Sequence, residues 1–173
     1  MRLRGFQKLT AVEEALKLFF DKLRMERLKT VTVSLSEALN RVLAVDIVAE
    51  EDLPRFDRSA VDGFAVKAHD TFGASQFKPK ILKITDEDEV CKEQARVVWT
   101  GNPLPKGANA VVMLENTRRI GDKIEVWVSA TPGENVSKKG EDVKKGEVAI
   151  RDGTRLKPQH LGLLAALGIA DVK

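Results

Sequence analysis

Residues 54–66 read PRFDRSAVDGFAV and mark the point at which the sequence changes to β-rich patterns. The stretch is too polar for a core strand, but Asp62-Gly63 is a turn signal and Phe64, Ala65 and Val66 then start a strand. Beyond it, residues 79–150 are almost entirely β in pattern. The predicted strands are KILKI, ARVVW, NAVVML, KIEVWV and EVAI. RRIGDKIEV predicts a hairpin with its turn at Gly121-Asp122.

Helical patterns occupy both ends of the chain. Residues 9–28 predict an amphipathic helix with a capping box between Thr10 and Glu13. Next, TVTVSL alternates as a strand, SEALNRVLA predicts a short helix capped by Ser36, and VDIVAE predicts a strand. Near the end, LKPQHLGLLAALG predicts a helix with Pro158 in its first turn and Gly168 just past its end.

This order of elements predicts an α+β fold. An α/β base is built from residues 1–50 and 141–173, and a β-rich lobe of residues 51–140 is inserted into it. We expect the N-terminal and C-terminal helices to pack together in that base. Because the last residues, IADVK, begin a strand-like segment, we also expect the chain to be part of a longer protein.

Composition narrows the class of protein. With 43% hydrophobic and 32% charged residues among 173, the chain has a globular composition. The net charge of +3 comes from interleaved charges, whereas a nucleic-acid surface clusters its basic residues. The single Cys91 excludes an internal disulfide and a cysteine metal cluster, and His69 and His160 lack ligand-like spacing. Without a signal peptide or a long apolar run, the sequence predicts a cytoplasmic protein with no membrane partner.

Three polar loops carry the candidate functional residues. In FDRSAVDGFAV, a carboxylate at a strand entrance suits a ligand or metal ion, although local turn hydrogen bonds alone are the favoured explanation of Asp57 and Ser59. In WTGNPLPKGANAVV, a threonine hydroxyl beside glycine N–H groups suits an anion, although a rigid connection between strands explains it too.

The third loop, PGENVSKKGEDVKKGEV, spans residues 132–148 and places two lysines before two carboxylates. Such a group suits a phosphate and its Mg²⁺. A solvated hairpin edge, with lysines that block aggregation, accounts for the same residues. Taken singly, each loop is explained better by a structural role.

Together and in this order, the loops resemble the amino-terminal region of the MoeA/gephyrin-E family, the molybdopterin molybdenumtransferases. The resemblance rests on FDRSAVDGFAV, TGNPLPKGANAVVMLENT, PGENVSKKGEDVKKGEV and the closing GTRLKPQHLGLLAALGIADV, and it covers the chain from about residue 10 onward. It implies a MoeA N-terminal-region-like fold. It also implies insertion of molybdate, or tungstate, into adenylylated molybdopterin with release of AMP and with Mg²⁺ as helper.

The resemblance assigns roles to residues of this chain. It implies Asp62, Thr100 and Asp142 as catalytic residues, Ser59, Gly101, Lys138 and Lys139 as anion-binding residues, and Asp62, Asp142 and Glu141 as Mg²⁺ ligands. The chain departs from the family pattern at Arg58, Phe64 and Asn102. Arg58 adds a cation near the expected anion.

The resemblance also implies partners. Family members form homodimers whose site lies between this region of one subunit and later domains of the other, and a molybdopterin adenylyltransferase supplies the substrate. The chain alone is therefore expected to be inactive. A non-catalytic dimerisation or scaffold module with the same fold is the main alternative, and a small nucleic-acid-binding protein is disfavoured by the interleaved charge.

Overall fold

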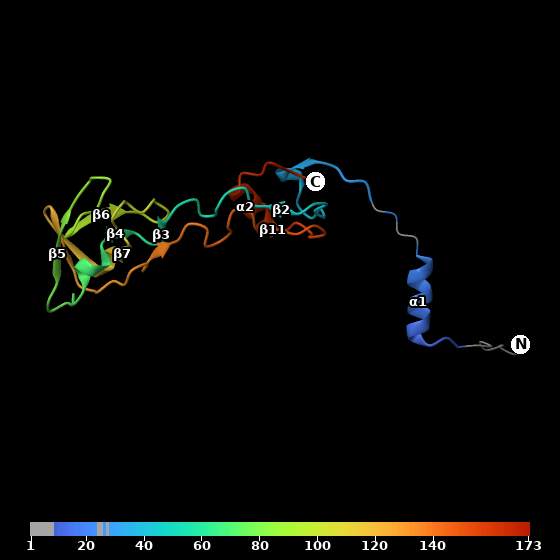
Figure 1. Ribbon diagram of the computed structural model, residues 1–173, viewed down its shortest axis with the longest axis horizontal. Coiled ribbons are helices and arrows are strands. Elements are labelled where there is room, and N and C mark those ends of the chain that lie inside the picture. Colours follow the sequence, from blue (N-terminus) through green and yellow to red (C-terminus); the bar gives the residue numbers. More distant parts are fainter. Residues whose placement is uncertain (1–8, 24–25, 27) are drawn as a thin grey trace, which may run out of the picture. The chain divides into compact units, whose positions relative to one another are not determined.

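The computed structural model describes residues 9–23, 26 and 28–173 (Figure 1). The chain divides into two compact units, residues 1–31 and residues 32–173. Helix α1 lies in the first unit and helix α2 in the second, so the expected packing of the two terminal helices stays a prediction. No helix in the described ranges is long and apolar enough to cross a membrane.

The first unit contains α1, Val12–Lys22, which is shorter than the predicted helix of residues 9–28. Ala11 is the N-cap and no side chain caps the helix, so the Thr10–Glu13 capping box is wrong. At Leu23 the backbone becomes extended, which ends the helix. Of the remaining predicted residues, 24, 25 and 27 lie outside the described part of the chain. The helix is amphipathic as predicted, but it buries none of its residues.

Short paired strands and α2 form one part of the second unit (Figure 1). β1, Val33–Ser34, pairs with β12, Asp171–Val172, and β2, Ile47–Val48, pairs with β11, Val148–Ile150. α2 spans Pro158–Ala166 and ends before Gly168, whose φ of +76° suits glycine, as predicted. These elements bury one apolar cluster, made of Ala38, Leu43, Ile47, Ile150, Leu156, Leu164 and Val172.

The predicted helix SEALNRVLA is wrong. Only the single 3-10 turn η1, Leu35–Glu37, forms there, and its N-cap is Ser34 rather than Ser36. Asn40 has a φ of +65°, a left-handed conformation that a right-handed helix cannot continue through. The helical pattern of the sequence is therefore overridden by a turn that leads into β2.

A six-stranded sheet forms the other part of the second unit, in the order β7-β4-β6-β5-β9-β8 (Figure 1). Its strands are β4 Gly63–Val66, β5 Lys80–Ile84, β6 Gln94–Val98, β7 Ala110–Met113, β8 Thr117–Ile120 and β9 Lys123–Val126. All neighbours pair antiparallel except β5 and β6. The 3-10 turns η2, Ala68–Thr71, and η3, Leu114–Asn116, lie between strands. The predicted strands and the β8–β9 hairpin, which turns at Gly121-Asp122, are confirmed.

The sheet has an apolar cluster on each face. The larger one is Phe64, Val66, Ala68, Leu82, Ala95, Ala110, Val112, Ile124, Val126 and Ala130, and the smaller one is Ala65, Val98 and Val111. Strand β4 is buried along its whole length between β6 and β7. The separate clusters of the sheet and of the α2 region agree with an inserted lobe, whose boundaries stay a prediction.

Gly63 begins strand β4 and is not a turn residue. A Cβ atom there would lie 2.1 Å from the carbonyl oxygen of Val112 on β7. Only glycine therefore allows the β4 and β7 backbones to approach each other this closely. The sequence signal at Asp62-Gly63 thus reflects close strand packing.

Candidate functional site

The three polar loops converge through their backbones. The N–H of Ser59 donates to the carbonyl of Asn102 at 2.9 Å, and the N–H of Gly101 donates back to the carbonyl of Ser59 at 2.8 Å. Strand β3, Arg58–Ser59, pairs antiparallel with β10, Val136–Ser137, which joins the first loop to the third. Loops that lie far apart in the sequence are thereby fixed side by side.

An apolar residue from each loop strengthens this convergence. Val61, Leu104 and Val136, one from each loop, pack against the smaller apolar cluster of the sheet. Burial of aliphatic side chains stabilises such packing by about 1.5–3 kcal/mol per fully buried residue. The three loops therefore pack on the same face of the sheet, against the smaller apolar cluster.

Asp62 and Thr100 form the closest pair of predicted catalytic residues. The backbone N–H and the hydroxyl of Thr100 both donate to Oδ1 of Asp62, at 2.7 and 2.8 Å. These two bonds hold the pKa of the exposed Asp62 carboxyl below its ordinary value. Asp62 lies directly before β4 and is therefore an ionised carboxylate at the mouth of a central strand.

Ser59 does not orient Asp62. Its buried hydroxyl donates to the carbonyl of Val61 and accepts from the N–H of the same residue at 3.4 Å. This is a local turn contact of the kind serine commonly makes. The family resemblance implies that Ser59 binds an anion; in the structure its hydroxyl stabilises the turn that leads to Asp62.

The hydrogen-bond donors of Thr100 and Gly101, which are predicted to bind an anion, are bonded to other residues in this structure. Both donors of Thr100 are bonded to Asp62, and the N–H of Gly101 is bonded to Ser59. Gly101 has a φ of +86° and open space around its Cα, so its conformation serves the turn. An anion-binding role for this loop would need these bonds to rearrange.

The lysines of the third loop are paired with carboxylates. Nζ of Lys138 lies 2.7 Å from Oδ2 of Asp57, and Nζ of Lys139 lies 3.4 Å from Oδ2 of Asp52. The N–H of Lys139 also donates to Oδ1 of Asp57 at 2.9 Å. The explanation of Asp57 by local turn hydrogen bonds alone is therefore wrong, because its carboxylate binds a segment some 80 residues away.

Glu141 and Asp142 of this loop have different partners. Glu141 accepts from the Ser137 hydroxyl and from the N–H of Lys138 at 2.7 Å. The Ser137 bond and then the Lys138 bond lower the pKa of the Glu141 carboxyl. Asp142 lies near Arg58, with Oδ2 3.7 Å from Nη2. The family departure at Arg58 thus places a cation directly beside a predicted catalytic carboxylate.

The predicted Mg²⁺ ligands do not form one site. Among the described residues, no three acidic, histidine or cysteine side chains are placed to hold a metal ion together. Both oxygens of Glu141 are already bonded, and Asp142 lies beside a guanidinium. The three carboxylates are therefore not placed together as one set of ligands. Because Mg²⁺ typically needs only one or two carboxylates beside substrate phosphates, its binding by one of them stays a prediction.

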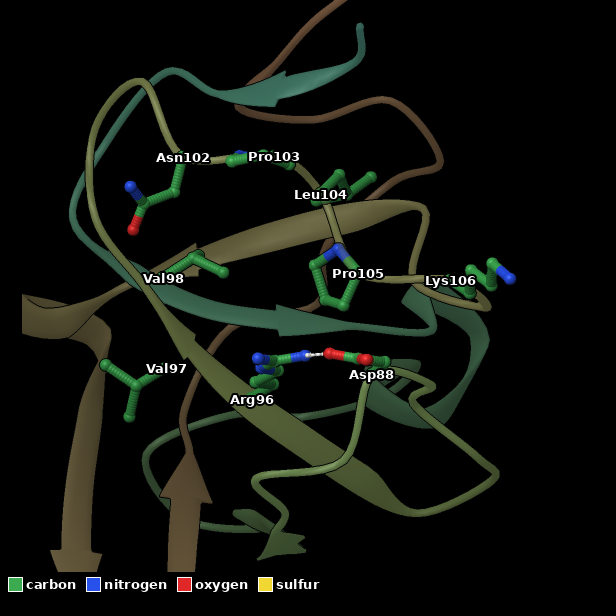
Figure 2. A pocket seen from close by; sticks show the side chains of 9 residues that line it. All are labelled: Asp88, Arg96, Val97, Val98, Asn102, Pro103, Leu104, Pro105 and Lys106. Atoms are coloured by element: carbon green, nitrogen blue, oxygen red, sulfur yellow. Dashed lines mark hydrogen bonds and ion pairs between the residues drawn. The ribbon is translucent and has the colours of Figure 1, made fainter.

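A cavity of about 390 Å³ adjoins the converged loops. Leu53, Pro54, Arg55, Phe56, Arg58, Gly101 and the end of α2 line it. Another, of about 430 Å³, lies beside residues 102–106, and Figure 2 shows the Arg96–Asp88 pair in its wall, with Nη1 3.0 Å from Oδ1. None of the predicted site residues lines this second cavity.

Sequence reasoning missed the carboxylates that hold the third loop. Asp52 accepts from the N–H of Lys145 at 2.9 Å, and Asp57 accepts from Lys138 and Lys139. Nothing in a single sequence joins residue 57 to residue 138. The sequence offered one indication, which is that Asp57 is a carboxylate in the same motif as Ser59 and Asp62, to which functional roles are given.

Comparison with known proteins places this arrangement in a family. The MoeA N-terminal region, described as domains I and II, matches residues 10–168. The chain belongs to the MoeA family. The MoeA N-terminal-like fold is confirmed by a crystal structure of a molybdopterin biosynthesis moeA protein from Pyrococcus horikoshii, with a TM-score of 0.86 and 49% identity over 95% of this chain and 45% of that one.

Curated relatives give the same family. A Methanocaldococcus jannaschii protein named for molybdopterin biosynthesis is 46% identical over 96% of this MoeA chain and 43% of its own length. A molybdopterin molybdenumtransferase of Staphylococcus aureus is 36% identical over 94% of this chain and 40% of its own length. The chain thus spans about two fifths of the length of these relatives.

Proposed function

We propose that this MoeA-family chain is the N-terminal part of a molybdopterin molybdenumtransferase, which inserts molybdate or tungstate into adenylylated molybdopterin and releases AMP. One observation carries the proposal: the motif residues Asp62 and Thr100 meet in two short hydrogen bonds where three loops converge. The names of the relatives, which include molybdopterin molybdenumtransferases, support the reaction class.

Asp62 is the residue best suited to act on the reacting atoms. Both Thr100 donors reach Oδ1, and within the described residues no hydrogen-bond donor reaches Oδ2. The lowered pKa shows that the Thr100 bonds favour the charged carboxylate, whose Oδ2 can accept a hydrogen bond from a ligand atom. To release AMP, an oxygen of water would attack a phosphorus of the pyrophosphate-like linkage and break its P–O bond, which yields AMP and a phosphate that stays on molybdopterin. Asp62 would orient that attacking water.

Thr100 has a supporting role in this proposal. Its two donors fix the position and charge of Asp62, which matters because a positioned charge acts best when it does not move during reaction. Asp142 would supply a second carboxylate to the site, and the guanidinium of Arg58 would partly neutralise its charge. Arg58 would also favour an anionic group next to Asp142, such as a phosphate or molybdate oxygen.

The proposal extends to partners. We propose that the full-length protein is a cytoplasmic homodimer supplied by a molybdopterin adenylyltransferase, and that this chain is inactive alone. The exposed apolar face of α1 supports self-association, since Val12 is 70%, Phe19 58% and Phe20 63% exposed. Light scattering of the full-length protein at micromolar concentration checks the dimer, and a monomer contradicts it.

The test of the activity uses the full-length protein. With adenylylated molybdopterin and molybdate, we expect release of AMP together with formation of the metal-containing cofactor, and little of either with this chain alone. AMP and cofactor are measured in the same reaction. A full-length protein that dimerises but releases no AMP would contradict the proposal and favour a non-catalytic scaffold.

A further inference from the structure

We propose that Asp57 is a positioning residue, which fixes the 138–142 loop, carrying Glu141 and Asp142, against the loop that carries Asp62. Its effect on turnover rests on the proposed function, whereas its effect on the loop does not. Among the described residues, the side chain of Asp57 makes no hydrogen bond to Asp62 or Thr100. It would affect the site through its bonds to Lys138 and Lys139.

The geometry of Asp57 carries this inference. Oδ2 accepts from Nζ of Lys138 at 2.7 Å, and Oδ1 accepts from the backbone N–H of Lys139 at 2.9 Å. A bond to a lysine ammonium alone would leave the loop free, because that side chain is long and mobile. The bond to the Lys139 N–H is different, because it fixes the loop backbone itself.

Besides Asp57, the loop is held by the β3–β10 pairing, which ends at Ser137, and by the N–H of Gly140, which donates to the carbonyl of Pro54 at 2.9 Å. Within it, the N–H of Lys138 donates to Oε2 of Glu141 at 2.7 Å, and the N–H of Glu141 donates to the carbonyl of Lys138 at 3.1 Å. The N–H of Asp142 donates to the carbonyl of Leu53 at 3.0 Å. The N–H groups of Lys138 and Glu141 thus bond within the loop, and that of Lys139 bonds to Asp57. Loss of the Asp57 contact should therefore loosen Lys138, Lys139 and Glu141, while Gly140 stays bonded to Pro54.

A merely stabilising contact makes a different prediction. Exposed ion pairs contribute little to global stability. If Asp57 only adds such a pair, its removal changes the exchange of the single amide that it binds. If it positions the loop, amides that it does not touch also become less protected.

Amide hydrogen exchange of this chain, followed by NMR, distinguishes a positioning role of Asp57 from a merely stabilising contact. For Asp57→Ala we expect the amides of Lys138, Lys139 and Glu141 to exchange about tenfold faster or more, the scale of losing a charge-assisted hydrogen bond. Asp57→Asn retains an acceptor for Lys139 and should give a smaller increase. Asp46→Ala is the matched control, because Asp46 likewise accepts a backbone N–H from a residue far along the chain, that of Asp152 at 2.7 Å.

Two results overturn the proposal. One is acceleration confined to the Lys139 amide, as in the Asp46→Ala control for Asp152. The other, in the full-length protein, is unchanged kcat for Asp57→Ala despite a loosened loop, since we expect kcat to fall about tenfold with KM changed less. A full-length wild type that releases no AMP counts against the proposed function alone, and the exchange data still decide the role of Asp57.

Discussion

Gly63 sets the distance between the two strands β4 and β7 at the centre of the lobe. A methyl group at this position would meet the Val112 carbonyl oxygen at 2.1 Å and Cγ1 of Val111 at 3.1 Å. Because the Val112 carbonyl belongs to the backbone of a paired strand, it cannot move away without disturbing the ladder. The requirement is one of space, since the backbone of Gly63 is ordinary extended strand.

Gly63→Ala should therefore destabilise the chain by about 3 kcal/mol, the upper range for an overpacked core. The control is Gly162→Ala on α2, where nothing lies within 4 Å of the added atom. That change should stabilise the helix by about 0.5–1 kcal/mol. Urea unfolding measures both, and equal effects of the two substitutions would refute the close-packing explanation.

Acid should weaken the site through its carboxylates. Hydrogen bonds lower the pKa of Asp62, Asp57 and Glu141, through Thr100, Lys138 and Ser137 first. A lowered pKa means that the folded chain binds fewer protons than the unfolded one. Their contribution to stability is thus full above the ordinary carboxylate pKa and is lost as the pH falls through the lowered values.

The thermal stability of wild type should accordingly fall between neutral pH and about pH 3 more than that of Asp62→Asn, which has no charge to lose at this position. Melting temperatures of both proteins across that range provide the measurement. Parallel curves for the two would mean that Asp62 is not stabilised in its charged form.

At the level of elements, the first 31 residues form a compact unit of their own. The apolar clusters described in the chain all come from residues 33–172. Deletion of residues 1–31 should therefore leave the melting temperature of the remaining chain within about 3 °C of its original value. A chain that loses cooperative unfolding after this deletion would show that the second unit needs the first.

Elements with strong local patterns could be predicted from the sequence, and those decided by distant contacts could not. β5, β9 and the β8–β9 turn follow from alternating apolar residues and a Gly-Asp pair. The segment SEALNRVLA has a helical pattern, yet it turns at Asn40 because its neighbours pair with the C-terminal part of the chain. Arg41, for example, accepts from the N–H of Leu156 at 2.8 Å through its carbonyl.

The same distinction holds for the site. The motif members Asp62 and Thr100 could be assigned from the sequence, and the structure joins them directly. The bonds of Asp57 to the third loop could not be assigned, because 81 residues separate it from Lys138. Likewise, two lysines before two carboxylates in the sequence predict a phosphate and metal site. In the fold, Lys138 and Lys139 form ion pairs with Asp57 and Asp52, and Asp142 lies beside Arg58.

On the scale of the whole molecule, this chain belongs to the MoeA family. It spans about two fifths of the length of its relatives. The described residues provide an ionised carboxylate, a second carboxylate beside a guanidinium, and an adjoining cavity. In our proposal, the remaining part of the full-length protein and its dimer partner complete the substrate site.

The turnover of Asp62→Asn in the full-length protein tests this account most directly. The substitution keeps the shape and an acceptor for Thr100 but removes the charge, so AMP release should fall on the order of a hundredfold. The melting temperature at neutral pH should fall only slightly, because the Asp62 carboxylate is exposed and such charges contribute little to stability. Asp46→Asn, which lies outside the three loops, should retain wild-type turnover. Near-normal AMP release by Asp62→Asn, or a loss explained by unfolding, would contradict the central role of Asp62.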